Sequence, residues 1–193
     1  MKVLFINGSP HRHGMVGQLM EAIRESLPES YESDWVQVSE LNIAPCKGCM
    51  TCRSERKCVQ PEDDAQRIMS KIQQADALVV GSPCYWGNMN GYLKLLFDRM
   101  VYGLIKDNAF GFPKPLHKGK KVVLVATCTT SFPFNILYRQ SRGTIKALRS
   151  IMKLSGFKIV GTLEKGGTSK KSDISKKEKA KCIRLAGKLQ MSI

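Results

Sequence analysis

Four cysteines lie within the short segment APCKGCMTCRSERKCVQPEDD, at positions Cys46, Cys49, Cys52 and Cys58. Two consecutive C-x-x-C spacings are typical of thiolates that share a metal or take part in redox chemistry. Zinc sites built from four cysteines more often draw two pairs from separate segments. In a reducing compartment, disulfides are the weaker interpretation of the chain's seven cysteines. The cluster therefore predicts metal or redox chemistry.

A second segment with chemical potential is NGSPHRHGMVGQL (7–19), a polar, glycine-punctuated turn that runs directly into a predicted helix. Backbone N–H groups at such a turn converge on an anion, which makes a phosphate the natural ligand. The Ser9 hydroxyl is a further donor, and His11 or Arg12 adds positive charge. Because many strand-to-helix turns need only a glycine, an ordinary structural turn stays the alternative.

Two later loops carry aromatic rings and hydroxyl groups. The segment GSPCYWGNMNGYLKLLFDRM (81–100) has Tyr85 and Trp86 at its tip, and two rings there are suited to stack on a flat aromatic cofactor. The alternative is that both rings pack over the edge of a sheet. The segment TCTTSFPFN (127–135) supplies hydroxyls and backbone N–H groups after a buried strand.

These loops need elements that bring them to one edge of the molecule. Apolar or alternating runs predict strands at 2–6, 34–41, 76–83, 120–128 and 157–164. Helical spacing and N-terminal signals predict helices at 15–27, 61–75, 90–104, 139–155 and 173–190, and 107–119 is expected to be a long connection. The alternation indicates an α/β fold with a doubly wound, five-stranded parallel sheet and helices on both faces. The three loops then meet at the carboxyl ends of the strands, where such sheets bind ligands.

The composition favours a single domain over residues 1–193, because a chain of this length with 42% apolar content can bury one substantial core. The apolar run at residues 3–6 is too short for a secretory signal. No stretch approaches the roughly 20 apolar residues that span a bilayer. We therefore expect a soluble, cytoplasmic protein without membrane contact.

The formal net charge of +15 is concentrated late in the chain. Between Lys165 and Lys188, nine Lys or Arg residues stand against Asp173 and Glu178. A solvated helix face is the simpler explanation, because no aromatic residue alternates with these lysines as a nucleic-acid site would require. We expect no specific nucleic-acid binding, whereas a phosphorylated cofactor or an acidic redox protein would be attracted to this surface.

The segments GSPHRHG, CKGCMTCRSERKCVQPEDD and ADALVVGSPCYWGNMNGYLKLLFDRM together resemble the NADPH-dependent FMN reductase and iron-sulfur flavoprotein branch of the flavodoxin-like superfamily. The likeness covers nearly the whole chain in order. It implies a flavodoxin-like fold with strand order 2-1-3-4-5 and noncovalent FMN at the strand ends. The residues that it places around the phosphate are Ser9, His11, Arg12, Gly14, Met15 and Val16. Those that it places around the isoalloxazine are Pro83, Cys84, Tyr85, Trp86, Gly87 and Asn88, with Thr127, Cys128, Thr129 and Thr130 closing the other side.

The sequence departs from this family pattern in its first loop. His11, Met15 and Val16 stand where the family has Arg, Asn and Thr, so two side-chain donors are missing. At roughly 1 to 1.5 kcal/mol for each hydrogen bond, FMN binding would weaken by one or two orders of magnitude. Cys84 and Cys128 are most simply buried small apolar residues, although the resemblance brings either of them near the flavin.

For the cysteine segment, the resemblance implies a [4Fe-4S] cluster on Cys46, Cys49, Cys52 and Cys58, whose short spacings let successive thiolates reach adjacent corners of one cubane. A cluster-free loop at a subunit interface ranks equally, and zinc ranks behind both. The implied activity is hydride transfer from NAD(P)H to FMN and then electron transfer to a flavin, quinone or protein acceptor. The alternative is an iron-sulfur electron carrier.

No catalytic side chain is required by this chemistry. Asp63 and Asp64 fit the capping of a helix better than catalysis. The histidines, His11, His13 and His117, form no recognisable ligand set. The resemblance also implies a homodimer or homotetramer that delivers electrons to a small-molecule acceptor or to an acidic redox protein.

Overall fold

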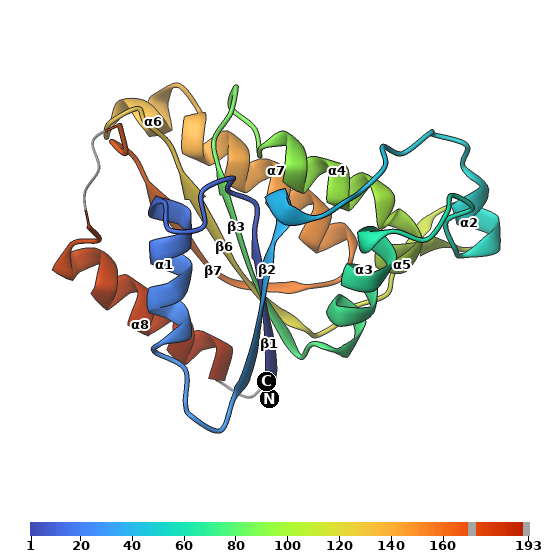
Figure 1. Ribbon diagram of the computed structural model, residues 1–193, viewed down its shortest axis with the longest axis horizontal. Coiled ribbons are helices and arrows are strands. Elements are labelled where there is room, and N and C mark those ends of the chain that lie inside the picture. Colours follow the sequence, from blue (N-terminus) through green and yellow to red (C-terminus); the bar gives the residue numbers. More distant parts are fainter. Residues whose placement is uncertain (170–172, 191–193) are drawn as a thin grey trace.

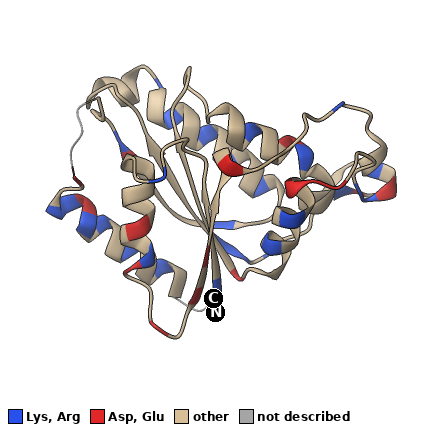
Figure 2. Cartoon of the chain, viewed as in Figure 1, with Lys and Arg blue, Asp and Glu red and all other residues tan. Residues whose placement is uncertain are grey.

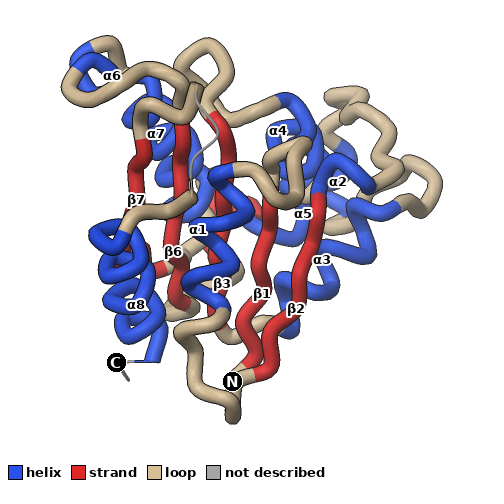
Figure 3. The backbone as a smooth tube through the Cα atoms, turned by 60° about the vertical axis from the view of Figure 1, so that its left-hand side comes forward, coloured by secondary structure: helices blue, strands red, loops and turns tan. Residues whose placement is uncertain are grey.

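The computed structural model describes residues 1–169 and 173–190. Five parallel strands form the central sheet, in the spatial order β2-β1-β3-β6-β7 (Figures 1 and 3). The strands are β1 (Lys2–Asn7), β2 (Glu32–Gln37), β3 (Ala77–Pro83), β6 (Lys121–Thr127) and β7 (Lys158–Lys165). The prediction of an α/β fold with a five-stranded parallel sheet is therefore confirmed.

The helices cover both faces of the sheet, with α1 and α8 on one side and α3, α4 and α7 on the other (Figures 1 and 3). Their bounds are α1 (Met15–Arg24), α2 (Thr51–Glu55), α3 (Asp64–Gln74), α4 (Gly91–Arg99), α5 (Val101–Leu104), α6 (Phe134–Leu137), α7 (Gln140–Leu154) and α8 (Lys176–Gln190), with a 3-10 turn η1 at Val38–Glu40. The predicted stretch 90–104 divides into α4 and α5 at Met100, and α2 and α6 were not predicted.

The core consists of two apolar layers, one on each face of the sheet. The side chains of residues 3–6 in β1 are fully buried, and they alternate between the two layers. The short apolar stripe of α8, which includes Cys182 and Leu185, packs in the same layer as α1. The continuous apolar strands thus carry the pattern that a sheet covered on both faces requires.

Two elements differ from the predicted pattern. The connection 107–119 contains β5 (Pro113–Pro115), which pairs with β4 (Ile105–Asp107) in a separate antiparallel ribbon. Because β4 and β5 belong to this ribbon, the last two strands of the main sheet are labelled β6 and β7. The second strand of the main sheet ends at Gln37 rather than at residue 41, because Val38–Glu40 form the 3-10 turn η1.

The basic residues of α8 lie on its outer surface, as Figure 2 shows at the left of the molecule. Lys165 pairs with Glu178 at 2.6 Å, which neutralises part of this charge. Lys170 and Lys171 of the predicted basic run lie outside the described residues. Within 1–169 and 173–190, no helix combines the length and the apolar character that a membrane crossing requires.

Candidate functional site

A cavity of about 1000 Å³ lies at the carboxyl ends of the central strands. Three loops border it, and they follow β1, β3 and β6, as the position of the sheet edge predicts. Its lining residues are Ser9, Pro10, His11, Arg12, His13, Gly14, Met15, Val16, Gln18, Pro83, Tyr85, Thr127, Thr129, Thr168 and Asp173.

The loop after β1 presents the N-terminus of α1 to this cavity. Gly14 is the N-cap, and no side chain caps the first turn of the helix. The first amides of α1 are therefore directed at the space that the loop encloses, which is the arrangement that binds anions. Gly17 is required here, because a Cβ at this position would lie 1.8 Å from the carbonyl oxygen of Arg12.

Buried polar side chains hold this loop in place. Asn7 accepts a hydrogen bond from the Ser9 amide at 3.0 Å, and the Ser9 hydroxyl accepts one from the His11 amide at 3.1 Å. The Gln37 side chain donates to the Ser9 carbonyl and the Asn90 side chain to the Gly8 carbonyl. The loop is thus bonded by side chains to β2 and to the start of α4.

Arg12 supplies the positive charge at this end of the cavity. Its guanidinium lies 5.7 Å from the centre of the Trp35 ring, which in turn stacks on Phe5. This contact keeps the side chain at the rim of the cavity. His13 also lines the cavity and lies in the same loop, although its position was not predicted to be part of the site.

The loop after β3 forms a tight turn with Trp86 and Gly87 at its centre. Both residues have positive φ, 54° and 72°, and Tyr85 pairs with Asn88 across the turn. Tyr85 lines the cavity, whereas the Trp86 side chain is fully exposed and does not. The structure therefore brings one of the two predicted rings into the cavity.

This turn rests directly on the first residues of α7. A Cβ at Gly143 would lie 2.0 Å from the Gly87 carbonyl oxygen, so the two backbones can approach only because residue 143 is a glycine. The Thr144 hydroxyl donates to the Asn88 carbonyl at 3.0 Å. Helix α7 thus sets the position of Tyr85.

The loop after β6 closes the opposite wall. Thr127 and Thr129 line the cavity, while Cys128 between them is buried on the other side of the chain. Thr168 joins the wall because its amide donates to the Cys128 carbonyl at 3.1 Å. Thr168 and Asp173 were missed from the sequence, since they follow β7 and carry no motif of their own.

The predicted cofactor residues therefore divide into two groups. Those that line the cavity are Ser9, His11, Arg12, Gly14, Met15, Val16, Pro83, Tyr85, Thr127 and Thr129. Those that do not line it are Cys84, Trp86, Gly87, Asn88, Cys128 and Thr130.

The cysteine loop lies apart from this cavity. It projects with α2 beyond α3 and α5, at the right of Figure 1. All four of its cysteines are free thiols; Cys46 and Cys49 are exposed, and Cys52 and Cys58 are half-buried. Among the described residues, no three potential ligands are gathered closely enough to hold a metal.

Several donors nevertheless point at these sulfurs. The Gly48 amide donates to the Cys46 sulfur at 3.5 Å. The Thr51 hydroxyl donates to the Cys49 carbonyl at 3.5 Å, and hydrogen bonding with Thr51 lowers the pKa of the Cys49 thiol. Burial, reinforced by the neighbouring thiols of the loop, raises the pKa of Cys52. Of the two exposed thiols, Cys49 thus lies in surroundings that favour the thiolate.

The two ends of the cysteine loop are held together at its base. Asp63 caps α3 by accepting from the Ala65 amide, and Gln66 completes a capping box, which confirms the predicted capping role of Asp63. Arg99 of α4 donates to both the Ala44 carbonyl at 2.6 Å and the Asp63 carboxylate at 2.5 Å. Although burial alone would raise it, hydrogen bonds from Ala65, Ala44 and Arg99 keep the pKa of Asp63 below its ordinary value.

Arg99 also has N–H groups without a hydrogen-bond partner beneath this loop. Its side chain is fully buried, yet Nε and Nη2 have no hydrogen-bond partner. A buried guanidinium N–H without an acceptor is costly, so this position favours a negatively charged neighbour. Cys58 is one such neighbour: although burial alone would lower it, interactions with Asp63 and Cys58 raise the pKa of Arg99.

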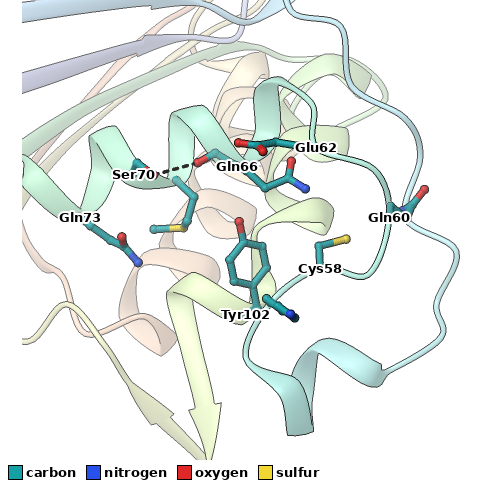
Figure 4. Close-up of a pocket in the computed structure, with 9 residues that line it drawn as sticks. Cys58, Gln60, Glu62, Gln66, Ser70, Gln73 and Tyr102 are labelled. Carbon is teal, nitrogen blue, oxygen red and sulfur yellow. Dashed lines mark hydrogen bonds between the residues drawn. The ribbon is translucent and has the colours of Figure 1, made fainter.

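A second, smaller cavity of about 320 Å³ lies between the cysteine loop and α3 (Figure 4). The Cys58 thiol and the Tyr102 ring face it, together with Gln60 and Gln66 (Figure 4). Burial raises the pKa of Tyr102. Cys58 thus lines the smaller cavity, which is separate from the larger one.

His117 is buried and lines neither cavity. Its ring stacks on Phe157 at a centroid distance of 4.9 Å, and Nε2 lies 2.9 Å from the Gly103 carbonyl oxygen. It shares no contact with His11 or His13, which lie in the first loop of the larger cavity. The three histidines are thus not gathered into one site.

Comparisons with known proteins agree with this architecture. An iron-sulfur flavoprotein of Methanocaldococcus jannaschii is 37% identical over 100 residues, 51% of each chain. One from Archaeoglobus fulgidus is 39% identical over 100 residues, 51% of this chain and 48% of that one. The chain thus spans about half the length of the curated relatives it matches.

Solved structures match over nearly the full length. An azoreductase from Bacillus anthracis superimposes with a TM-score of 0.75 at 16% identity, covering 99% of this chain and 100% of its own. An NAD(P)H:quinone oxidoreductase from Methanothermobacter marburgensis has a TM-score of 0.72 at 20% identity, covering 100% and 98%. At these identities the likeness shows a common fold. The family model described as NADPH-dependent FMN reductase, however, matches residues 1–164, and the chain therefore belongs to that family.

Proposed function

We propose that this protein is an FMN-dependent oxidoreductase that takes a hydride from NAD(P)H and passes electrons to a flavin, quinone or protein acceptor. The observation that carries the proposal is the shape of the larger cavity. It joins an uncapped helix N-terminus at one end to a wall of Tyr85, Thr127 and Thr129 at the other. One end suits a phosphate and the other a flat ring.

The residues present fit FMN. The volume of about 1000 Å³ lies at the upper end of the range of roughly 300–1,000 Å³ for ligand pockets. The amides at the start of α1, with Arg12 nearby, would hold the phosphate, and Tyr85 would lie against the ring. When bound, FMN supplies the hydride and electron chemistry. The side chains of the cavity bind and orient the cofactor.

The proposal is tested by titrating flavin-free protein with FMN and following the quenching of flavin fluorescence. Tyr85→Leu should raise the Kd of FMN by about tenfold, because aromatic contacts contribute up to about 1.5 kcal/mol. Tyr92→Leu is the matched control, since Tyr92 is 49% exposed against 47% for Tyr85 and lies outside the cavity. Equal affinities for the two variants, or no FMN binding by the parent protein, would contradict the proposed site.

The reductase activity has a separate test. Anaerobic rapid mixing of the FMN-loaded protein with NADPH or NADH should bleach the flavin absorbance. If FMN binds but neither nucleotide bleaches it, the protein is an electron carrier that does not oxidise NAD(P)H. The same mixing experiment distinguishes NADPH from NADH.

A second candidate is an electron carrier with a [4Fe-4S] cluster on Cys46, Cys49, Cys52 and Cys58. The observation that favours it is the buried Arg99, which offers two unpartnered N–H groups beneath a loop of four free thiols. The donor set fits such a cluster, although the thiols would have to draw together first. When bound, the cluster would supply one-electron transfer.

Anaerobic purification with iron and acid-labile sulfide analysis, together with one absorption spectrum, separates the candidates. Iron and sulfide in equal amounts support the cluster, zinc supports a structural metal, and neither supports a cluster-free loop. The control is a variant with Ser at the four positions, which should lose any bound metal and keep FMN. Loss of both ligands would point to misfolding of the loop.

For assembly, we propose a homodimer or homotetramer whose interface includes an exposed apolar patch beside the cavity. This patch lies on the 85–88 turn and on and around α6, and its residues are Tyr85, Trp86, Phe132, Phe134, Leu137 and Tyr138. Exposed apolar patches of this kind mark interaction surfaces. Sedimentation velocity of the parent protein and of Trp86→Ser tests this, since a monomeric parent would contradict it.

The electron acceptor is proposed to be a small molecule or an acidic redox protein attracted to α8. An association that weakens steeply with salt supports the protein acceptor. Specific nucleic-acid binding is not expected, and salt-sensitive retention of RNA or DNA at physiological ionic strength would contradict that expectation.

A further inference from the structure

Two cysteines outside the cysteine loop stand opposite each other in the sheet. The pairing of β3 with β6 ends with Pro83 opposite Thr127. The next amide, that of Cys84, donates to the Thr127 carbonyl at 2.7 Å, which continues the parallel ladder and places Cys84 opposite Cys128. Neighbouring strands lie about 4.8 Å apart. This spacing falls within the range of about 4.4–6.8 Å between Cα atoms in disulfides.

The two sulfurs also face the same helix. The Cys84 sulfur lies 3.4 Å from the side-chain oxygen of Gln140, and the Ser141 amide donates to the Cys128 sulfur. Gln140 and Ser141 are the first residues of α7, whose first turn has no side-chain cap. Both thiols therefore contact the N-terminal end of the same helix.

The two thiols differ in accessibility. Cys128 is only 5% exposed, and burial, together with the neighbouring Cys84, raises the pKa of its thiol. Cys84 is half-buried. A small oxidant therefore reaches Cys84 first, and Cys128 lies beside the oxidised Cys84 sulfur.

We propose that Cys84 and Cys128 form a redox-active dithiol that closes to a disulfide when hydrogen peroxide oxidises it. The Cys84 thiolate attacks peroxide, the O–O bond breaks, and the products are a sulfenic acid and hydroxide, which is protonated to water. The Cys128 sulfur then attacks the Cys84 sulfur, an S–S bond forms, and a second water leaves. Two thiols and one peroxide thus give one disulfide and two waters. This goes beyond the proposed flavin chemistry and does not depend on it.

The bond would join two loops that border the larger cavity. Cys84 directly precedes Tyr85, and Cys128 lies between Thr127 and Thr129. A disulfide here therefore fixes the distance between two walls of the cavity.

The test uses the full chain, reduced and then treated with hydrogen peroxide, alkylated, digested and mapped by mass spectrometry. One peptide pair linked through Cys84 and Cys128 should appear and should disappear after a thiol reductant. Cys128→Ser should accumulate a sulfenic acid at Cys84 that a cyclic 1,3-diketone traps. Cys84→Ser should leave Cys128 as a free thiol, because Cys128 is buried.

Cys182→Ser is the control, since Cys182 is fully buried against α1 and should leave the linked pair unchanged. Recovery of both thiols unoxidised, under conditions that oxidise the cysteine loop, would overturn the proposal. So would linkage of Cys84 to any cysteine other than Cys128. Mapping of the unmutated chain decides the matter even where a serine variant fails to fold.

Discussion

The ion pair between Asp63 and Arg99 predicts an asymmetric response to mutation. Asp63→Asn leaves a fully buried guanidinium without its counter-charge, whereas Arg99→Met removes the cation altogether. Asparagine caps a helix about as well as aspartate, so the N-cap of α3 is retained in the first variant. The comparison therefore isolates the buried charge.

The contacts give the magnitudes. Breaking a buried pair from one side costs about 3–5 kcal/mol, which we expect for Asp63→Asn. In Arg99→Met, the carboxylate keeps the amides of Ala44 and Ala65 at 3.1 and 2.9 Å. Loss of the charged hydrogen bonds is then offset by removal of two buried, unpartnered N–H groups, each costing about 1–3 kcal/mol. The net cost should be about 1 kcal/mol.

Urea denaturation followed by circular dichroism measures both values. The double variant Asp63→Asn/Arg99→Met should be more stable than Asp63→Asn alone, because no charge is left unpaired. If Arg99→Met costs as much as Asp63→Asn, or if the double variant shows the sum of both losses, the reasoning from an unpaired buried cation is wrong.

The same pair predicts a dependence on pH. The folded-state pKa of Asp63 is lowered, so its stabilising contribution is complete above the ordinary value of 3.8. It is lost as the pH falls from there through the lower folded value. Asp63→Asn should lack this component, so its stability relative to the parent should improve as the solution becomes more acidic. A constant difference between the two proteins would contradict the assignment.

Three further predictions concern the larger cavity and the buried histidine. Gly143→Ala should destabilise the protein by about 1–3 kcal/mol in thermal unfolding, because its Cβ would meet the Gly87 carbonyl at 2.0 Å. Ser9→Ala should raise the Kd of FMN by about five- to tenfold in fluorescence titration, through loss of one hydrogen bond. Burial lowers the pKa of His117, so the parent should lose stability as the pH falls from 6.5 toward the lower folded value, and His117→Phe should not.

Each of these has a matched control. Gly187→Ala in α8 should be neutral or stabilising, since nothing lies within 4 Å of its Cβ. Ser26→Ala removes a half-buried hydroxyl that bonds to the Ala22 carbonyl outside the cavity, and it should leave the Kd of FMN unchanged. A control that behaves like its partner variant would refute the corresponding explanation, as would equal urea midpoints for the parent and His117→Phe across the acidic range.

The strands and the main helices could be predicted because their signals are local. The apolar run of β6 and the capping pattern at Asp63 each lie within a few neighbouring residues, and both predictions agree with the structure. By contrast, β2 ends at Gln37 because the backbone turns there into η1, although the alternating pattern of residues continues to Leu41. Helix α2 lies between Met50 and Arg56, whose backbones are left-handed, and its sequence has no apolar periodicity that would predict a helix.

The candidate site divides in the same way. Residues of the first loop were found because a turn before a helix attracts anions whatever lies around it. Trp86 was expected beside the ring because of its size, but the backbone of a turn with two positive φ values sends its side chain to solvent. Thr168 was missed because it reaches the cavity through a bond to the Cys128 carbonyl, a contact that only the folded chain contains.

Two hydrogen bonds join the ends of the cysteine loop at its base. Amides of Asn42 and Ala44 bond to the carboxylates of Asp64 and Asp63, so the chain leaves the domain and returns to it at almost one point. Between those two anchors the segment supplies no strand to the central sheet and no lining residue to the larger cavity. Changes in the length or sequence of this segment should therefore alter its own contacts more than those of the sheet.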